Sequence, residues 1–267
     1  MERKMKVKLE GVQETLLIPL VLRAMETQSE NSRIIDKNAV DIVNKIDYDF
    51  SKFKKRGSYQ GVIARTLILD RETQHFIDTY ENCICISVGC GLDTRYQRIR
   101  HKKVTWYNLD FPNVIDLRRK LLYEDKNVKF IKKSALDISW TDEVEEKDRP
   151  TLIILEGILM YFDEVEVMQL FSMLRNHFPE CTILAEIMHP FIAGKSKYHD
   201  TVKSTSAVFK WGIETGKQME KMCEGIQFIK EWNLFDELTD QGFLYKIAGK
   251  VPFIRNKNNK IVMFRME

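Results

Sequence analysis

The sequence predicts an α/β protein built on a doubly wound, mostly parallel β-sheet. From residue 83 onward, short runs of apolar and β-branched residues alternate with amphipathic stretches at helical spacing. Runs such as 152–155 are apolar throughout, which is typical of strands covered on both faces. The run that ends at Val88 leads directly into Gly89 and Gly91, a strand-to-loop junction that doubly wound folds place beside a ligand.

The first 80 residues are expected to be helical. Helices of this kind must bury their apolar faces against another layer, so we expect residues 1–80 to form a helical cap on the sheet. No stretch with the composition of a linker separates this cap from a Rossmann-like core at 81–267, and a single domain over 1–267 is therefore expected. Apolar side chains recur at helical spacing in residues 14–26, 37–46 and 63–80.

Five strands are expected in the middle of the chain, with helical stretches between several of them. Two more strands, 244–248 and 260–264, lie on either side of a turn-like Asn-Lys-Asn-Asn segment and can close the sheet as a hairpin. The segment 190–235, between the fifth and sixth strands, is long enough to form a lid over a site. The first five strands cover residues 83–88, 105–109, 128–132, 151–155 and 181–187.

Charge and composition argue against several classes of protein. The chain has 42 basic and 39 acidic residues, a near balance that creates no large field to hold a polyanion, so nucleic acid is not an expected partner. No apolar stretch approaches the ~18 residues of a membrane span, and the charged N-terminus lacks the apolar part of a secretion signal. We therefore expect a cytoplasmic protein with no membrane partner. Beside Cys83 and Cys85, no second pair of Cys or His stands at ligand spacing, so no metal is expected.

The loop after strand 83–88 is the clearest functional signal. Gly89 and Gly91 lack a Cβ, which lets the backbone turn sharply and approach a ligand. Asp110 ends the next strand, and its carboxylate can accept hydrogen bonds from both hydroxyls of a ribose. Thr94 stands where a pyrophosphate-binding motif has its third glycine. The pattern therefore favours a cofactor with a ribose and no pyrophosphate, such as S-adenosylmethionine, over a nicotinamide dinucleotide, although two close glycines also occur in ordinary tight loops.

Two more acids follow predicted strands, at the edge where doubly wound sheets bind their ligands. Asp137 can accept a hydrogen bond from an adenine amine while Ile138 packs on the ring, or it can simply cap a turn. Glu156 ends an otherwise apolar run, and a buried acid there needs a partner, for which a ligand is one candidate.

Short motifs spread over nearly the whole chain are shared with one family. They are Glu14-Thr15 with Arg23-Ala24, residues 46–50, Arg65-Thr66, the loop 88–95, residues 109–112 and residues 156–161. In these motifs the chain resembles the leucine carboxyl methyltransferase family, and within it the tetracenomycin-type polyketide O-methyltransferase branch. The resemblance implies a seven-stranded methyltransferase sheet whose last strand is antiparallel, and an S-adenosylmethionine-dependent O-methyltransferase activity.

The resemblance also implies roles for single residues. Arg65 would bind the methionine carboxylate of the cofactor, for which its planar guanidinium is suited. Arg23 is a second candidate for that carboxylate. On the residues alone, a surface arginine on an exposed helix face is the favoured interpretation of Arg65. In the same way the family implies Gly89 for the backbone approach, Asp110 for the ribose, Asp137 and Ile138 for the adenine, and Glu156 for the amino group.

Methyl transfer from a sulfonium requires alignment and exclusion of water, and a base only where the acceptor must lose a proton. Tyr161, after the fourth strand, and His189, after the fifth, are the candidate catalytic residues, although either can be an ordinary loop or packing residue. The expected acceptor is a carboxyl or hydroxyl of a small molecule. A protein C-terminal carboxyl methyltransferase and a non-catalytic S-adenosylmethionine-binding protein remain alternatives, and the oligomeric state is left open.

Overall fold

The computed structural model describes residues 4–7, 9, 11–53, 56–100, 103–193, 207–242, 245, 247, 250–251 and 255–266. Its centre is a seven-stranded sheet in the order β5-β4-β3-β6-β7-β9-β8. Only β9 runs antiparallel to its neighbours, so the predicted α/β sheet with an antiparallel last strand is confirmed. The strands are β3 (Cys83–Val88), β4 (Val104–Asp110), β5 (Val128–Lys132), β6 (Thr151–Leu155), β7 (Thr182–Ile187), β8 (Ile226–Asn233) and β9 (Lys260–Met266).

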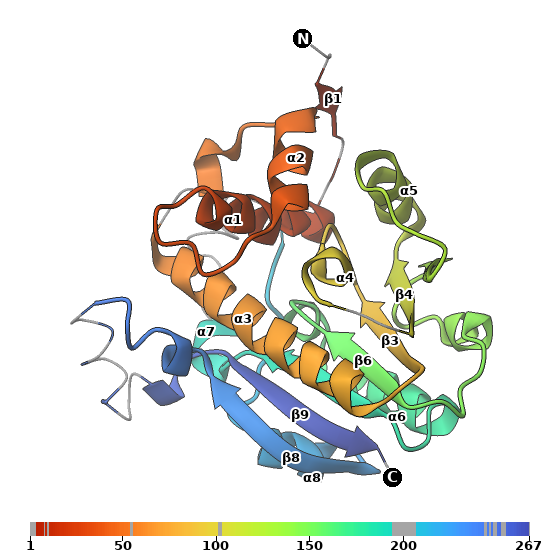
Figure 1. Ribbon diagram of the computed structural model, residues 1–267. Coiled ribbons are helices and arrows are strands. Elements are labelled where there is room, and N and C mark those ends of the chain that lie inside the picture. Colours follow the sequence, from red (N-terminus) through yellow and green to blue (C-terminus); the bar gives the residue numbers. More distant parts are fainter. Residues whose placement is uncertain are drawn as a thin grey trace.

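Helices cover both faces of this sheet (Figure 1). On one face, α3 (Arg56–Thr79) packs its apolar side chains against Cys83 and Cys85, which lie together in the core as free, buried thiols. On the other face lie α6 (Glu164–His177) and α8 (Gly216–Met222). Both faces are therefore covered, which explains why the central strands β3 and β6 are buried at every position.

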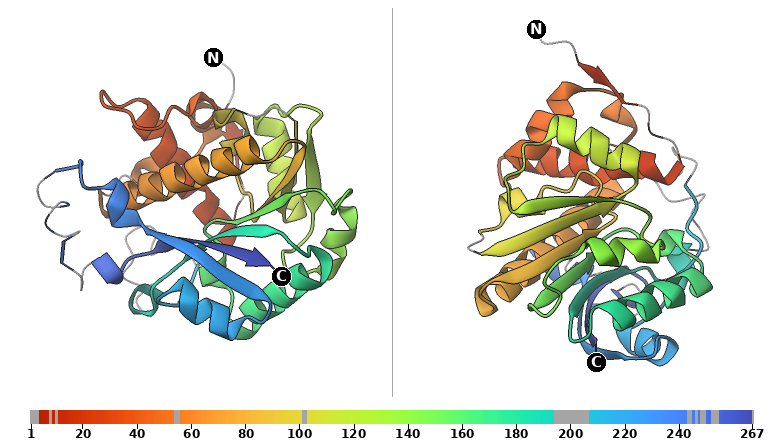
Figure 2. Two further views of the ribbon diagram at one scale, coloured as in Figure 1. Left: turned by 60° about the horizontal axis from the view of Figure 1, so that its bottom comes forward. Right: turned by 90° about the vertical axis from the view of Figure 1, so that its right-hand side faces the viewer.

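A smaller helical layer lies over the carboxyl ends of the parallel strands (Figures 1 and 2). Its apolar core joins α1 to α2 and also contacts Leu121, at the end of α5. The third helix predicted near the N-terminus, α3, packs on the face of the sheet and so belongs to the core. A pattern of apolar residues in the sequence does not tell which layer a helix packs against. The elements of this layer are η1 (Gly11–Leu16), α1 (Leu17–Thr27), α2 (Lys37–Lys45), η2 (Phe50–Phe53) and α5 (Pro112–Leu121), beside a two-stranded sheet of β1 (Met5–Lys6) and β2 (Ile46–Asp47).

The end of the chain differs from the sequence prediction. The strand beside β9 is β8, which falls inside the range 190–235 that was expected to be a lid. Most of the predicted strand 244–248 lies outside the described residues, and its described members Tyr245 and Ile247 are helical. The remaining short elements are α4 (Arg95–Arg98), η3 (Ile138–Glu143), η4 (Leu159–Tyr161), α7 (Pro190–Ala193) and η7 (Leu234–Glu237).

Membrane-spanning helices and metal sites are both absent from the described ranges. No described helix has the length and apolar character that crossing a membrane requires. No group of described His, Cys, Asp and Glu side chains is arranged to hold a metal ion.

Candidate functional site

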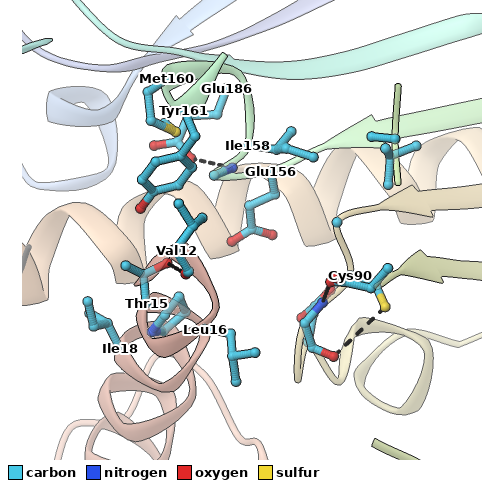
Figure 3. A pocket seen from close by; sticks show the side chains of 18 of the residues that line it. Val12, Thr15, Leu16, Ile18, Cys90, Glu156, Ile158, Met160, Tyr161 and Glu186 are labelled. Atoms are coloured by element: carbon cyan, nitrogen blue, oxygen red, sulfur yellow. Dashed lines mark hydrogen bonds between the residues drawn. The ribbon is translucent and has the colours of Figure 1, made fainter. Parts of the chain in front are cut away.

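A cavity of about 780 Å³ lies between the helical layer and the carboxyl ends of β3, β4, β6 and β7. This volume is in the range of small-molecule sites. Figure 3 shows Tyr161 on one side of it facing Val12 and Thr15 of η1 on the other, with Glu156 beside them. We call the part of the cavity lined by the glycine loop and the strand-end acids its polar end, and the part lined by the cluster of Met160, Tyr161, Met188 and Phe209 its apolar end.

The glycine loop after β3 forms the floor of the polar end. Gly89 has φ +67°, in the left-handed region, and a Cβ at this position would lie 2.7 Å from Cδ1 of Ile158. Gly91 also has a positive φ, of +49°, and its N–H donates to Oδ2 of Asp110 over 2.8 Å. Side chains are thus excluded where the backbone meets the cavity, as predicted for a loop that a ligand approaches closely.

Asp110, at the end of β4, is held by backbone donors alone. Its Oδ2 accepts from Gly91 and its Oδ1 accepts from the N–H of Phe111, also over 2.8 Å. Burial raises the pKa of this carboxyl, and the two backbone hydrogen bonds together with Arg118 only partly offset that effect. Each oxygen keeps capacity for a further hydrogen bond, so the fixed carboxylate is suited to a pair of neighbouring hydroxyls.

Arg65 reaches the cavity from α3 and lies between two acids. Its Nη1 donates to Oε2 of Glu186 over 2.9 Å, and its Nε lies 2.9 Å from Oε1 of Glu156. Burial alone would lower the pKa of the guanidinium, but Glu186 and Glu156 outweigh it and raise that pKa. The contact to Glu156 is an ion pair without hydrogen-bond geometry, so the buried Nε has no acceptor among the described residues.

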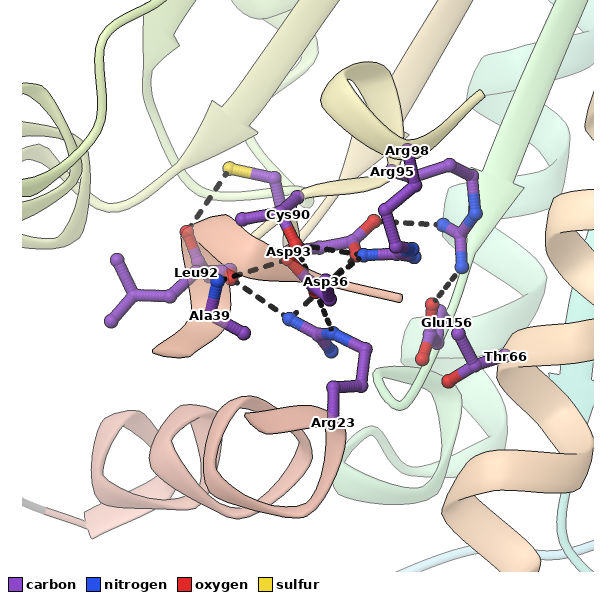
Figure 4. Close-up of polar contacts among 12 residues, drawn as sticks. Arg23, Asp36, Ala39, Thr66, Cys90, Leu92, Asp93, Arg95, Arg98 and Glu156 are labelled. Atoms are coloured by element: carbon purple, nitrogen blue, oxygen red, sulfur yellow. Dashed lines mark hydrogen bonds and ion pairs between the residues drawn. The ribbon is translucent and has the colours of Figure 1, made fainter. Parts of the chain in front are cut away.

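Glu156 connects Arg65 to a second cluster of buried charges (Figure 4). Its Oε2 accepts from Nη2 of Arg95 over 2.7 Å. Arg95 is fully buried and also pairs with Asp70 and Asp93, over 2.8 and 2.9 Å. Burial would raise the pKa of Glu156, but Arg95 and Arg65 outweigh it, so that this pKa is lowered and the acid is ionised.

Arg23 has its contacts on the other side of this cluster. Its Nε pairs with Asp36 over 2.9 Å, and its Nη2 donates to the carbonyl oxygen of Leu92 over 3.1 Å. The side chain lines the cavity, but these contacts bind α1 to the glycine loop. Of the two arginines predicted for a ligand carboxylate, Arg65 is therefore the one with a buried N–H left over.

The structure does not bring three of the predicted site residues to the cavity. Asp137 is exposed and caps η3, where it accepts from the N–H of Ser139 over 3.0 Å. Ile138 is 55% exposed and, like Asp137, does not line the cavity, where Leu136 does. His189 also lies outside the lining, and its Nδ1 accepts from the N–H of Phe191. The alternative explanation, in which Asp137 caps a turn, is the one that this geometry favours.

Tyr161 is the predicted catalytic candidate that does line the cavity. It stands at the end of η4, and its ring lies 5.6 Å from that of Phe209, next to Met160 and Met188. Burial raises the pKa of its hydroxyl, although Thr15 and Arg65 act in the opposite direction. Tyr161 therefore keeps its proton at neutral pH and can donate a hydrogen bond into the cavity.

Sequence reasoning missed Glu186 and Arg95. Glu186 is the penultimate residue of β7, so the signal that singled out Glu156, an acid at the end of an apolar strand, applied to it as well. Arg95 stood inside the motif loop but gave no sign of its partners, because Asp70 and Glu156 are distant in sequence.

Known proteins share sequence with most of this chain. A family model described as leucine carboxyl methyltransferase matches residues 17–175. The tetracenomycin polyketide synthesis O-methyltransferase TcmP of Streptomyces glaucescens is 28% identical over 232 residues, which is 86% of this chain and 86% of that protein. The S-adenosyl-L-methionine-dependent methyltransferase dpfgK of Gibberella zeae is 26% identical in an alignment that covers 92% of this chain and 90% of that one.

The fold also has solved relatives. A crystal structure of a proposed methyltransferase from Thermobifida fusca superposes with a TM-score of 0.63 at 14% identity, over 94% of each chain. At this level of identity the likeness concerns the fold alone.

Proposed function

Because this chain belongs to the leucine carboxyl methyltransferase family and is thus an S-adenosylmethionine-dependent methyltransferase, we propose that it methylates an oxygen of a small, largely apolar molecule. The observation that carries this proposal is the two-ended cavity. Its polar end, with the glycine loop, Asp110 and Arg65, suits the cofactor, and its apolar end, with Tyr161 and Phe209, suits the acceptor.

Three features support the fit of the cofactor at the polar end. The missing side chain at Gly89 leaves room for a close approach, and Asp110 offers two fixed acceptors to the ribose hydroxyls. Arg65 lines this end, and its planar guanidinium is suited to the methionine carboxylate. Glu156 and Glu186 add negative charge, which favours a ligand with an ammonium and a sulfonium group. When bound, S-adenosylmethionine supplies a methyl group that is already activated for displacement.

The residues of the acceptor end favour a carboxylate over a hydroxyl. Tyr161 keeps its proton and is thus a donor, not a base. No histidine occurs among the described residues that line the cavity, and Glu166 is engaged in capping α6. A carboxylate is ionised at neutral pH and needs no base, whereas a phenol with a pKa of about 10 does. For such an acceptor the apolar wall has to align the carboxylate with the cofactor and exclude water.

The proton balance of the reaction tests this choice. In a carboxylate acceptor, one oxygen lone pair forms the new C–O bond, the C–S bond breaks towards sulfur, and no proton is released. A hydroxyl acceptor releases one proton for each methyl transferred. We expect turnover of planar aromatic acids in weak buffer to form S-adenosylhomocysteine without acidification, and the product to be cleaved by hydroxylamine as an ester is.

Stoichiometric acidification with a hydroxylamine-resistant product would instead identify a hydroxyl acceptor. Acceptance of peptides with a free C-terminus, and not of small acids, would favour the protein carboxyl methyltransferase. Binding of S-adenosylmethionine without turnover of acids, phenols or peptides would favour a non-catalytic binding protein.

Substitution at the polar end tests the assignment of the cofactor site. We expect Asp110→Ala and Arg65→Ala each to weaken binding of S-adenosylmethionine by about 1–3 kcal/mol, because each removes charge-assisted hydrogen bonds. Asp137→Ala is the matched control, since this exposed carboxylate only caps η3, and it should leave the affinity unchanged. Calorimetric titration measures all three, and unchanged affinity in both Asp110→Ala and Arg65→Ala would contradict the site.

The proposal includes a cytoplasmic location. Its support is that all five cysteines are free and buried, as is usual for proteins kept in a reducing compartment.

A further inference from the structure

Glu186 is an acid of the cavity wall whose carboxylate hydrogen-bonds to three separate parts of the fold. It lies near the carboxyl end of β7, is 1% exposed, and reaches the cavity beside Met160 and Tyr161 (Figure 3). Its Oε2 accepts from Nη1 of Arg65 over 2.9 Å and from the N–H of Gly157 over 3.0 Å. Its Oε1 accepts from Nδ2 of Asn259 over 2.9 Å.

These contacts join separate parts of the fold at one carboxylate. Arg65 comes from α3, and Gly157 forms the turn after β6 with a positive φ of +64°. Asn259 directly precedes β9, the strand that pairs with β7. Glu186 thus fixes the guanidinium of Arg65 and also the turn at Gly157. Glu156 directly precedes Gly157 in the sequence, so the same turn carries Glu156.

The arrangement gives Arg65 a defined orientation. Glu156 and Glu186 approach it from adjacent strands, so the guanidinium is held between two carboxylates. Its buried Nε has no hydrogen-bond acceptor among the described residues. If Glu186 were neutral, Glu156 would remain as the only anionic partner of Arg65 among the described residues of the cavity wall. The planar guanidinium of Arg65 would then rotate towards Glu156.

We infer that Glu186 is a positioning residue for the amino-acid end of the cofactor, acting through Arg65 and Gly157. The inference rests on the proposed function, because it assigns Arg65 and Glu156 to the methionine part of S-adenosylmethionine. Adenosine, which lacks that part, should be insensitive to Glu186.

Glu186→Gln removes the charge while keeping the shape. The Gln oxygen can replace Oε2 towards Arg65 and Gly157, and its amide then faces Asn259. The Oδ1 of Asn259 is buried and has no hydrogen-bond partner among the described residues, so a half-turn of that amide would accept the new N–H. After the half-turn the Nδ2 of Asn259 takes the position that its Oδ1 holds without a partner, so the variant is expected to fold with no more unpaired buried groups than the wild type.

Glu231→Gln is the matched control. Its Oε1 contacts Nζ of Lys260 over 2.6 Å and its Oε2 accepts from the N–H of Gly216 over 3.0 Å, so it also joins a cation and a glycine amide. Glu231 lies on β8 and does not line the cavity. This control variant should bind every ligand as the wild type does.

The experiment is calorimetric titration of the full chain with S-adenosylmethionine, S-adenosylhomocysteine and adenosine. For Glu186→Gln we expect both amino-acid-bearing ligands to bind on the order of tenfold more weakly, the size of one weakened charge-assisted hydrogen bond. Adenosine affinity should stay within about twofold, well below the ~1.4 kcal/mol of a tenfold change. In an Arg65→Ala background the substitution should add almost nothing, because the Gln oxygen keeps the contact to Gly157 and the lost charge acts through Arg65.

Three results would overturn the inference. They are an unchanged affinity for S-adenosylmethionine in Glu186→Gln, an equal loss for adenosine, which would indicate a general structural role, and additive losses in the double variant. A wild-type protein that binds adenosine but neither amino-acid-bearing ligand would overturn the proposed function itself, and would be recognised before any variant is measured.

Discussion

Replacing Arg95 with Met is expected to lower the free energy of unfolding by about 3–5 kcal/mol, the range found when one partner of a buried ion pair is removed. Arg95 is fully buried and lies 2.7–2.9 Å from Asp70, Asp93 and Glu156. Methionine fills similar volume but leaves these carboxylates without their shared cation. For a chain of this size such a loss lowers the melting temperature by about 10 °C, and urea unfolding followed by circular dichroism measures it.

Arg71→Met provides the control for this prediction. Arg71 also contacts two acids, Glu72 and Glu237, but 48% of its side chain is exposed. Exposed ion pairs contribute little, so its loss should stay within about 0.5 kcal/mol. Equal losses in the two variants would show that the buried cluster does not stabilise the fold.

The wild type and the Arg95→Met variant should also differ in their stability at acid pH. Burial would raise the pKa of Asp93, but Arg95 and its neighbours outweigh it and lower that pKa, as they do for Glu156. Acids with a lowered pKa stabilise the fold above their unfolded pKa, and this contribution is lost as the pH falls through their folded pKa. Without Arg95 the folded pKa values rise, so acid unfolding should begin at a higher pH.

Gly89→Val is expected to abolish measurable cofactor binding, with a loss of about 100-fold or more. A β-branched residue is a strong outlier at a φ of +67°, and its side chain would meet Ile158 and fill the place where a ligand reaches the loop. Titration with S-adenosylmethionine measures this loss of affinity, at a temperature where the wild type and the Gly89→Val variant are both folded.

Gly225→Val separates backbone strain from ligand contact. Gly225 has a φ of +81°, and a Cβ there would lie 2.2 Å from Cδ of Arg175, yet it does not line the cavity. We expect this variant to lose stability and to keep its affinity for S-adenosylmethionine. Comparable loss of binding in both variants would mean that Gly89 acts through the fold.

Much of the fold could be predicted because parallel strands buried on both faces have an unmistakable composition. The limits of β3, β5 and β6 agree with the predicted 83–88, 128–132 and 151–155. The edge strand β8 was missed, since it carries charges such as Lys230 and Glu231 and shows no continuous apolar run. For α3, the amphipathic pattern was visible but did not tell which layer its apolar face would contact.

The candidate site was predictable where one residue type at a strand end suffices. Gly89, Asp110 and Glu156 all line the cavity. Asp137 does not, because the chemistry that suits an adenine amine equally suits the N–H groups of a turn. The pairing of Arg65 with Glu186 spans 121 residues, and no local pattern reports such a distance.

During synthesis the ribosome delivers β9 after every other described strand, yet β9 lies inside the sheet, between β7 and β8. Until it arrives, the edge of β7 with its apolar Ile183 and Leu184 has no partner and can pair with other chains. Asn259 directly precedes β9 and lines the cavity, so the nascent protein completes its ligand cavity only once this segment has been made, and a chaperone that shields the open edge would act before then.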